Sequence, residues 1–448
     1  MKKLILIALN EFNAAFFRHA CRVADLPNIS QLLSMHHSRT WTDDLVERKG
    51  LDPWVQWVSI HTGTPSSRHG IRHLGDVPNL SSPQLWERLS EQGISSGIWG
   101  AMNATRGSAE KCDFFLPDPW TFSEPAFPPE LNNLLALPRY YSRNYLEVGR
   151  LELTKSMGKL LLFLLTKPTL ILRLLRVIPL AIKGVAKFGL NNQVLFSVFD
   201  LVSATAFSHY KKSCQPQFSL VFLNSIAHVQ HNIWCAEGTL DERCLYALEA
   251  IDRSLGILTE CLESDESVVV MNALNQRNIV GKKHEILYRQ INPSRFLDEV
   301  GIRYNSVEQL MTNDAHILFE TIDSAISARN VLAAASINGQ PIFDVEFSDS
   351  TPRKLFFQLE YWEDLPGNAH FLLAGKNYPF FEHFEAVVKR TGEHLQDGDA
   401  YTRGLDLPGK LYNHEVQHHI LQYFDIEAPT NTQSNSVGGE PAKASAAL

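Results

Sequence analysis

The segment from Asp52 to Ile71 contains the residues whose types and spacing most directly suggest chemistry. It begins with Asp52-Pro53, a favoured helix start in which the Asp accepts backbone N–H bonds and the Pro takes the first helical position. An apolar helical run follows, and then Thr62-Gly63-Thr64-Pro65 and His69-Gly70-Ile71. A carboxylate at such a position is also a candidate nucleophile, base or metal ligand. Asp52 therefore either only caps the helix or takes part in a reaction.

The second half of this segment resembles a known motif. The pattern T-G-x-P-x-x-x-H-G-I after an apolar helix is similar to the nucleophile helix of the alkaline phosphatase superfamily, which includes nucleotide pyrophosphatases/phosphodiesterases and sulfatases. In that family the nucleophile opens the helix nine residues before Thr62, and this chain has Pro53 there. Because proline has no nucleophilic side chain, the resemblance makes Asp52 the nearest catalytic candidate. The amide of Gln56, one turn further on, is expected in the same pocket.

The resemblance also assigns metal-ligand positions, and most of them are substituted. The Asp that usually follows the first strand is replaced by Asn10, the Asp of a middle Asp-x-x-x-His by Asn224, and the Asp-His of a later motif by Asn272-Ala273. A carboxamide offers a neutral oxygen where a carboxylate offers a charged one. Two close divalent ions would therefore lack the anionic ligands that offset their dehydration. A two-metal site is not expected.

Two histidines of the family pattern are retained. The resemblance implies that His228 and His394 hold at most one divalent, zinc-like ion, because two or three imidazoles suffice for such an ion. His231, one helical turn after His228, or Asn224 is the candidate third ligand. The polar residues Asn10, Asn224, Asn272 and His231 are predicted to bind the ligand. Glu11 either points into the cleft and supplies the missing negative charge, as a catalytic residue, or is an ordinary loop carboxylate.

These positions need a scaffold that brings distant segments together. Apolar runs at 4–9, 218–223 and 268–271 are typical of central parallel strands, which are buried on both faces, and 94–99 is predicted to be a further core strand. Predicted helices at 26–33, 53–62 and 85–92 alternate with them, as in βαβ units. Together with the resemblance, this predicts an α/β fold, a three-layer α/β/α sandwich with a mainly parallel central sheet and a helical insertion. Its site is expected at the carboxyl ends of the strands.

The composition divides the chain into a core, an insertion and a tail. Residues 1–150 and 200–426 are predicted to form the alkaline phosphatase-like core, with a β pair at 353–362 and 369–374. The final residues, 427–448, have the composition of a disordered tail.

Residues 151–199 form a basic, leucine-rich helical insertion. No acidic residue occurs between 154 and 199, and Pro168 and Pro179 divide the segment into short helices. No apolar span in it reaches the length that crosses a bilayer. The segment is either a cap with buried apolar faces and solvated lysines, or an amphipathic surface that contacts an anionic membrane.

The net charge and the N-terminal sequence bear on nucleic-acid binding and on the location of the protein in the cell. A net charge of -8 argues against nucleic-acid binding, which needs a basic surface. The start Met1-Lys2-Lys3 and its apolar run imitate a signal peptide, but the run stops at Asn10 and is too short. A buried first strand explains it better, so a cytoplasmic protein is predicted, peripheral to the inner face of a membrane if the insertion contacts lipid.

The sequence thus predicts a divergent hydrolase or transferase that acts on a phosphate, phosphodiester or sulfate ester. Its substrate is a small molecule or an ester linked to a glycan or lipid. One alternative is a non-catalytic protein whose neutral, Asn-rich cleft binds a sugar or phosphorylated ligand. Another is a membrane-surface assembly protein that works through residues 154–199.

Overall fold

The apolar run near the start of the chain forms strand β1 (Leu4–Leu9), and all of its side chains are buried. In the computed structural model, which describes residues 1–45, 51–348 and 351–427, β1 pairs in parallel with β5 (Phe218–Leu223) and β6 (Ser267–Met271). A strand with parallel neighbours on both sides and helices above and below is buried on both faces. The predicted central strands are confirmed.

These three strands belong to an eight-stranded sheet with the order β20-β2-β19-β6-β1-β5-β3-β4. Only the two pairings made by β19 are antiparallel, so the sheet is mainly parallel, as predicted. The remaining strands are β2 (His36–Trp41), β3 (Ser96–Ala101), β4 (Cys112–Pro117), β19 (Asp397–Arg403) and β20 (Lys410–Tyr412).

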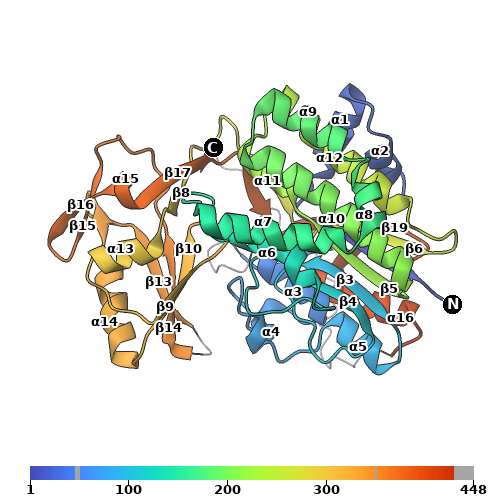
Figure 1. Cartoon of the computed structure of the whole chain (residues 1–448), viewed down its shortest axis with the longest axis horizontal. Coiled ribbons are helices and arrows are strands. Elements are labelled where there is room, and N and C mark those ends of the chain that lie inside the picture. The colour runs from blue at the N-terminus through green and yellow to red at the C-terminus, as the bar shows by residue number, and fades with distance from the viewer. Residues whose placement is uncertain (46–50, 349–350, 428–448) are drawn as a thin grey trace, which may run out of the picture.

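Helices cover both faces of this sheet (Figure 1). Ile5, Ile7 and Leu9 pack with α1 (Ala14–Val23), α2 (Pro27–Leu33), α10 (Asn192–Cys214), α11 (Ser225–Asn232) and α12 (Glu242–Thr259). The alternate residues Leu4, Leu6 and Ala8 pack with α3 (Pro53–Thr62), α5 (Leu85–Glu91) and α16 (Val416–Tyr423). Successive side chains of a strand point to opposite faces, so one strand contributes to two apolar cores. The three-layer α/β/α architecture is therefore confirmed.

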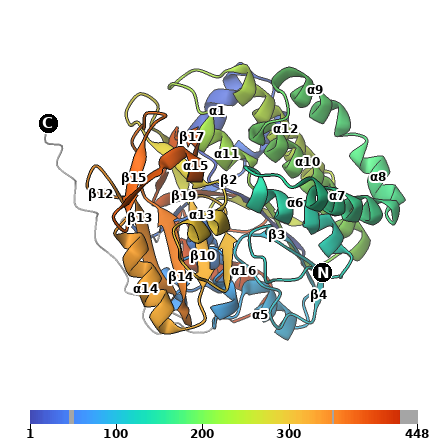
Figure 2. The same cartoon turned by 60° about the vertical axis from the view of Figure 1, so that its left-hand side comes forward.

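A second, smaller lobe lies beside this sandwich (Figures 1 and 2). The chain enters it after β7 (Asn275–Asn278) and returns through β18 (Gly392–Leu395), which pairs antiparallel with β7. The lobe has an apolar core of its own, which includes Phe296, Phe343 and Phe357. The sequence pattern did not distinguish this lobe from the core range 200–426.

The smaller lobe consists of short antiparallel sheets and three helices. Its elements are β8 (Ile286–Gln290), α13 (Pro293–Glu299), β9 (Ser306–Gln309), β10 (Asp314–Leu318), α14 (Ile322–Ala333), β11 (Ser336–Ile337), β12 (Gln340–Pro341), β13 (Phe343–Ser348), β14 (Thr351–Leu359), β15 (His370–Leu373), β16 (Lys376–Pro379), α15 (Phe380–His383) and β17 (Phe384–Lys389). The predicted pairing of 353–362 with 369–374 is wrong. β14 pairs with β13 and β10, whereas β15 pairs with β16 and β11, so the two predicted partners lie in two separate sheets.

The basic insertion forms short helices, as its prolines predict. After α6 (Leu131–Asn144) come α7 (Arg150–Leu165), α8 (Pro168–Leu174) and α9 (Ile178–Phe188). Pro168 and Pro179 lie in the first turns of α8 and α9. None of the helices in the described ranges has the length and apolarity needed to cross a bilayer. Of the predicted tail, residues 428–448 lie outside the described residues.

Candidate functional site

Glu11 follows β1 in a turn that directs its carboxylate into the molecule. Its φ of 58° is a left-handed conformation that is uncommon for residues other than glycine. The side chain is buried, and Oε1 accepts a hydrogen bond of 2.8 Å from Nδ2 of Asn10. The backbone carbonyl of Glu11 accepts another, of 2.6 Å, from Nε2 of Gln230. Glu11 is therefore a fixed, inward-facing carboxylate and not a solvated loop residue.

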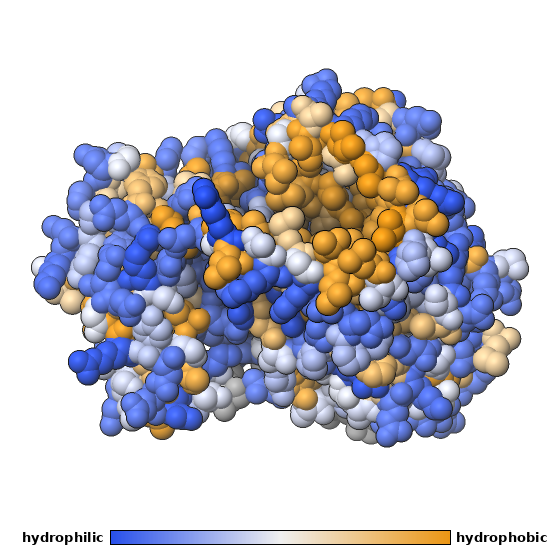
Figure 3. Space-filling view, in the orientation of Figure 1, coloured by the Kyte–Doolittle hydropathy of each residue, from blue (hydrophilic) through white to orange (hydrophobic). Residues whose placement is uncertain are grey.

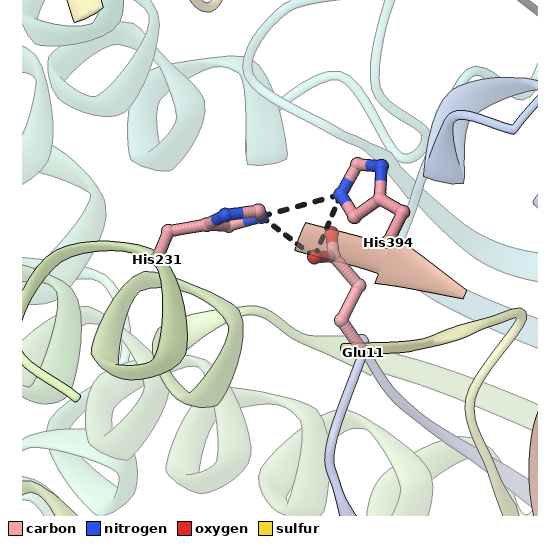
Figure 4. Close-up of side chains that lie close together, drawn as sticks. All are labelled: Glu11, His231 and His394. Atoms are coloured by element: carbon pink, nitrogen blue, oxygen red, sulfur yellow. Dashed lines mark hydrogen bonds and ion pairs between the residues drawn. The ribbon is translucent and has the colours of Figure 1, made fainter. Parts of the chain in front are cut away.

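Two imidazoles converge on this carboxylate (Figure 4). Oε2 of Glu11 lies 2.8 Å from Nε2 of His231 and 3.1 Å from Nε2 of His394. The two Nε2 atoms are 3.3 Å apart. The three side chains come from the end of β1, the last turn of α11 and strand β18. The fold thus brings together three residues that are far apart in the sequence.

The distances within this cluster suit a small divalent metal ion. A tetrahedral zinc ion with ligand bonds of about 2.0–2.2 Å separates any two of its ligand atoms by about 3.3 Å. The observed separations of 2.8, 3.1 and 3.3 Å are close to this value. Two imidazole nitrogens and one carboxylate oxygen are also a common three-residue ligand set of catalytic zinc sites.

The hydrogen bond on the far side of His394 fixes which nitrogen faces the cluster. Nδ1 of His394 lies 2.9 Å from the carbonyl oxygen of Leu51, and a carbonyl only accepts, so Nδ1 donates. In the neutral ring, Nε2 then presents a lone pair towards Glu11 and His231. In metal sites, a histidine ligand commonly donates its other ring N–H to a backbone carbonyl, which fixes the orientation of the ring in the same way. Because three electron-rich atoms converge, a proton or a metal ion has to lie between them.

The charges within the cluster oppose the effect of burial. Burial raises the pKa of Glu11, but the adjacent imidazoles His394 and His231 bring it well below its ordinary value. Burial lowers the pKa of His394, yet the charge and hydrogen bond of Glu11 raise it overall. For His231 burial prevails, and the pKa is lowered. The carboxylate of Glu11 thus favours the charged form of His394, whereas burial favours the neutral form of His231.

Asp52 lies at the edge of the cluster. It occupies the N-cap position of α3, but its side chain accepts no hydrogen bond from the helix. Its Oδ1 is instead 3.8 Å from Nδ1 of His394, and 27% of the side chain is exposed. Burial raises the pKa of Asp52 to about 6, although the charge of His394 opposes this. Asp52 therefore does not cap the helix through its side chain, and its carboxylate is partly exposed beside His394.

His228 does not join the cluster, which corrects its predicted pairing with His394. Its ring stacks on Phe196 of α10, with ring centroids 3.5 Å apart and an interplanar angle of 6°. Its Nε2 lies 3.3 Å from Nδ2 of Asn224. The stacking directs His228 towards α10, and His231, three residues later on the same helix, takes the position beside Glu11.

Gln56 is also not in the cluster. Its side chain is fully buried, and its Nε2 donates to Oδ2 of Asp44 at 2.6 Å. Its Oε1 accepts a hydrogen bond of 2.8 Å from Nδ2 of Asn413. These bonds join α3 to neighbouring segments, so the amide contributes to structure rather than to the pocket.

The three predicted asparagines have different surroundings. Asn272 is buried, and its Nδ2 donates to the backbone oxygen of Phe12 at 2.6 Å and to Asn275 at 2.8 Å. Asn10 touches the cluster, because its Nδ2 donates both to Glu11 and, at 2.8 Å, to Oδ1 of Asn224. Asn10 and Asn224 thus orient Glu11, whereas Asn272 joins strands below it.

Two further polar residues of the site, Gln276 and Arg390, were not predicted from the sequence. Nε2 of Gln276 donates to Oε2 of Glu11. Gln276 lies opposite His394 in the β7–β18 pair, a register that the sequence does not show. Arg390, just before β18, is close enough for its charge to lower the pKa of both Asp52 and His231. The only available signal was its position four residues before His394.

A cavity of about 710 Å³ lies near the site, lined in part by Asn13, Arg277 and Glu393. Residues 277 and 393 alternate along their strands with Gln276 and His394, so their side chains point to the opposite face of the β7–β18 ribbon. The ribbon therefore separates this cavity from the Glu11 cluster.

No protein-family model and no curated protein sequence matches this chain. Similar solved structures include phosphonoacetate hydrolase from Sinorhizobium meliloti 1021 in complex with phosphonoformate, which is 14% identical, with 94% of this chain and 95% of that chain covered and a TM-score of 0.44. Human ectonucleotide pyrophosphatase/phosphodiesterase 5 is 10% identical, with 96% and 97% covered and a TM-score of 0.45.

Proposed function

We propose that this chain is a divergent hydrolase or transferase of the alkaline phosphatase type. It acts on a phosphate, phosphodiester or sulfate ester and holds one divalent metal ion at Glu11, His231 and His394. The observation that carries the proposal is the convergence of one carboxylate oxygen and two Nε2 atoms at separations of 2.8 to 3.3 Å. The T-G-x-P-x-x-x-H-G-I motif at the end of α3 supports the same class of enzyme.

Neighbouring residues hold Glu11 and His394 in orientations that suit metal binding. The carbonyl of Leu51 holds His394 in the tautomer that leaves Nε2 available. Asn10 and Gln276 donate to the two oxygens of Glu11 and fix its orientation. Such outer contacts set the geometry and basicity of metal ligands. A divalent ion bound there would act as a Lewis acid towards an ester oxygen.

Asp52 is the residue that we assign to the reaction with substrate. Its carboxylate lies beside His394 at the N-terminal end of α3 and is partly exposed. It acts either as the nucleophile or as the base that activates water or an acceptor. The positive end of the α3 dipole and the nearby charge of Arg390 favour an anionic substrate.

The metal-free binding alternative has less support. It requires carboxamides that are available to a sugar or phosphorylated ligand. Both N–H groups of the Asn272 amide are already bonded within the chain, and so are both of Asn10. These amides have little capacity left for a ligand.

The first test is metal content. Purified protein supplied with zinc is expected to bind about one ion per chain, measured by elemental analysis after removal of unbound metal. Glu11→Gln, His231→Ala and His394→Ala are expected to lose it. His228→Ala is the matched control, because this histidine lies on the same helix as His231 but stacks on Phe196. Metal loss in His228→Ala with retention in His231→Ala would overturn the ligand assignment.

The second part of this test is turnover. Wild-type protein is screened against phosphate, phosphodiester and sulfate esters of a chromogenic alcohol. Asp52→Asn is expected to lower kcat by about a hundredfold or more while the bound metal is retained. Full activity of Asp52→Asn would exclude Asp52 as the reacting group. A protein that binds zinc but turns over none of the three ester classes would refute the proposed activity.

A further inference from the structure

The insertion helices α7, α8 and α9 carry an apolar surface that no other described part of the chain covers. Of the 19 exposed large apolar side chains in the described residues, 12 lie between residues 148 and 190, so the exposure is concentrated there. The most exposed include Leu151, Leu165, Leu172, Ile182 and Leu190, at 62% to 73%. Figure 3 shows a broad apolar patch around a hollow over this part of the molecule. Patches of this extent mark interaction sites.

The patch follows from the helical period of α7. Leu151, Leu161 and Leu165 lie on one side of this helix, whereas Phe163 and Ser156 are buried on the other. Side chains three and four residues apart share a face of a helix. The helix therefore uses one face to pack on the core and leaves a second apolar face without a partner. A role as a cap explains the face of α7 that packs on the core, but it does not explain the exposed apolar face.

Basic residues border this surface. Lys155 and Lys159 follow the exposed leucines around α7, Arg173 lies in the last turn of α8, and Arg176 follows that helix. Lys159, Arg173 and Arg176 have no acidic partner among the described residues. No acidic residue occurs between 154 and 199, although the whole chain has a net charge of -8. Lys155, Lys167, Lys183 and Lys187 pair with glutamates, so the positive charge available to a partner at this surface is that of Lys159, Arg173 and Arg176.

We propose that α7, α8 and α9 form a docking surface for a bilayer that contains anionic lipid. Short amphipathic helices with leucines on one side and basic residues at their edge bury the apolar side chains among acyl chains and attract anionic head groups. A second copy of the chain fits less well. A twofold dimer would place this surface against itself and would bring the unpaired arginines and lysines together.

The experiment is co-flotation of the full chain with vesicles. Vesicles of phosphatidylcholine alone are compared with vesicles of phosphatidylcholine and phosphatidylglycerol. The wild type is expected to float with the anionic vesicles and to be released by high salt. Leu161→Gln with Leu165→Gln and Leu172→Gln, and separately Lys159→Glu with Arg173→Glu and Arg176→Glu, are each expected to lower the bound fraction by about tenfold or more.

The control variant is Ile322→Gln with Ile326→Gln. These two isoleucines are also exposed, at 49% and 43%, but lie on α14 of the smaller lobe. This variant is expected to float as the wild type does, and circular dichroism checks that every variant is folded. Wild-type protein that does not float would overturn the proposal. So would a lipid-free dimer in sedimentation that the leucine substitutions convert to monomer.

Discussion

The buried and half-buried histidines of this chain differ in whether a carboxylate lies beside them. His231 and His394 share the carboxylate of Glu11, whose charge opposes the effect of burial on their pKa values. His61 in α3 is buried between Trp57 and Trp86, and neither ring nitrogen has a hydrogen-bond partner among the described residues. Burial lowers the pKa of His61 to about 3. His231 and His394 suit chemistry, whereas His61 contributes only to packing and to the response of the fold to acid.

This burial predicts a specific pH dependence of stability. His61 stays neutral in the folded chain but takes up a proton after unfolding below its ordinary pKa of 6.5, so the free energy of unfolding falls as the pH drops below that value. His61→Phe keeps an aromatic ring and is expected to remove about 2 kcal/mol of the loss between pH 6.5 and pH 5. Urea unfolding at each pH measures this. His370→Phe, at an exposed ring, is the control, and an unchanged pH dependence in His61→Phe would contradict the argument.

The sequence identified most of the site's segments but not which side chain each segment contributes. The motif positions led to Asn10, Asn224 and His394, because these directly follow or belong to recognisable elements. The choice between His228 and His231 depends on the stacking of His228 on Phe196, a contact between two helices. Gln276 depends on the register of β7 with β18. Such tertiary contacts have no signal in local composition or spacing.

At the level of elements, the site depends on the close approach of β18 to the end of α11. The backbone N–H of Thr391 donates to the carbonyl of His231 at 2.8 Å, and its hydroxyl donates to the carbonyl of Gln230 at 2.8 Å. Gly392 lies at the contact. A Cβ there would be 2.6 Å from the backbone oxygen of Gln230 and 2.2 Å from Oε1 of Gln276. The absence of a side chain at 392 therefore allows His394 to reach His231.

Gly392→Ala is expected to separate these two elements. Because the clash involves backbone, β18 or α11 has to move, and the free energy of unfolding should fall by about 1–3 kcal/mol. Zinc binding should weaken as well, since His394 moves with β18. Gly367→Ala is the matched control, because nothing lies within 4 Å of its added Cβ. Denaturant unfolding and zinc titration of both variants measure the effects. Equal stability of the two would show that the contact is not tight.

At the level of the whole molecule, the parallel sheet was predictable and the smaller lobe was not. Central strands such as β1 and β5 appear in the sequence as short apolar runs, a pattern typical of strands that are buried on both faces. Several strands of the smaller lobe, such as β9, β11, β12, β15 and β16, are only two to four residues long, so their pairing depends on neighbours in space. The insertion was predictable in part. Its composition predicted short basic helices, but it could not show which apolar side chains pack on the core and which stay exposed.

Arg289 connects the two lobes and allows a test of how firmly they are joined. This fully buried residue of β8 donates to the carbonyls of Met311 and Thr312 in its own lobe and, at 2.9 Å, to that of Ser142 in the last turn of α6. The terminal carbonyls of a helix lack partners within the helix, and a guanidinium there also complements its dipole.

Arg289→Met fills a similar volume but leaves these buried carbonyls without a donor. We expect the free energy of unfolding to fall by about 3 kcal/mol, with faster hydrogen exchange at the end of α6 and around residues 309–313. Arg295→Met is the control, because Arg295 is 43% exposed and its ion pair with Glu147 lies at the surface. Such a pair contributes about 1 kcal/mol or less. If both variants unfold at the same denaturant concentration and exchange alike, Arg289 does not join the lobes, and other contacts have to account for their arrangement.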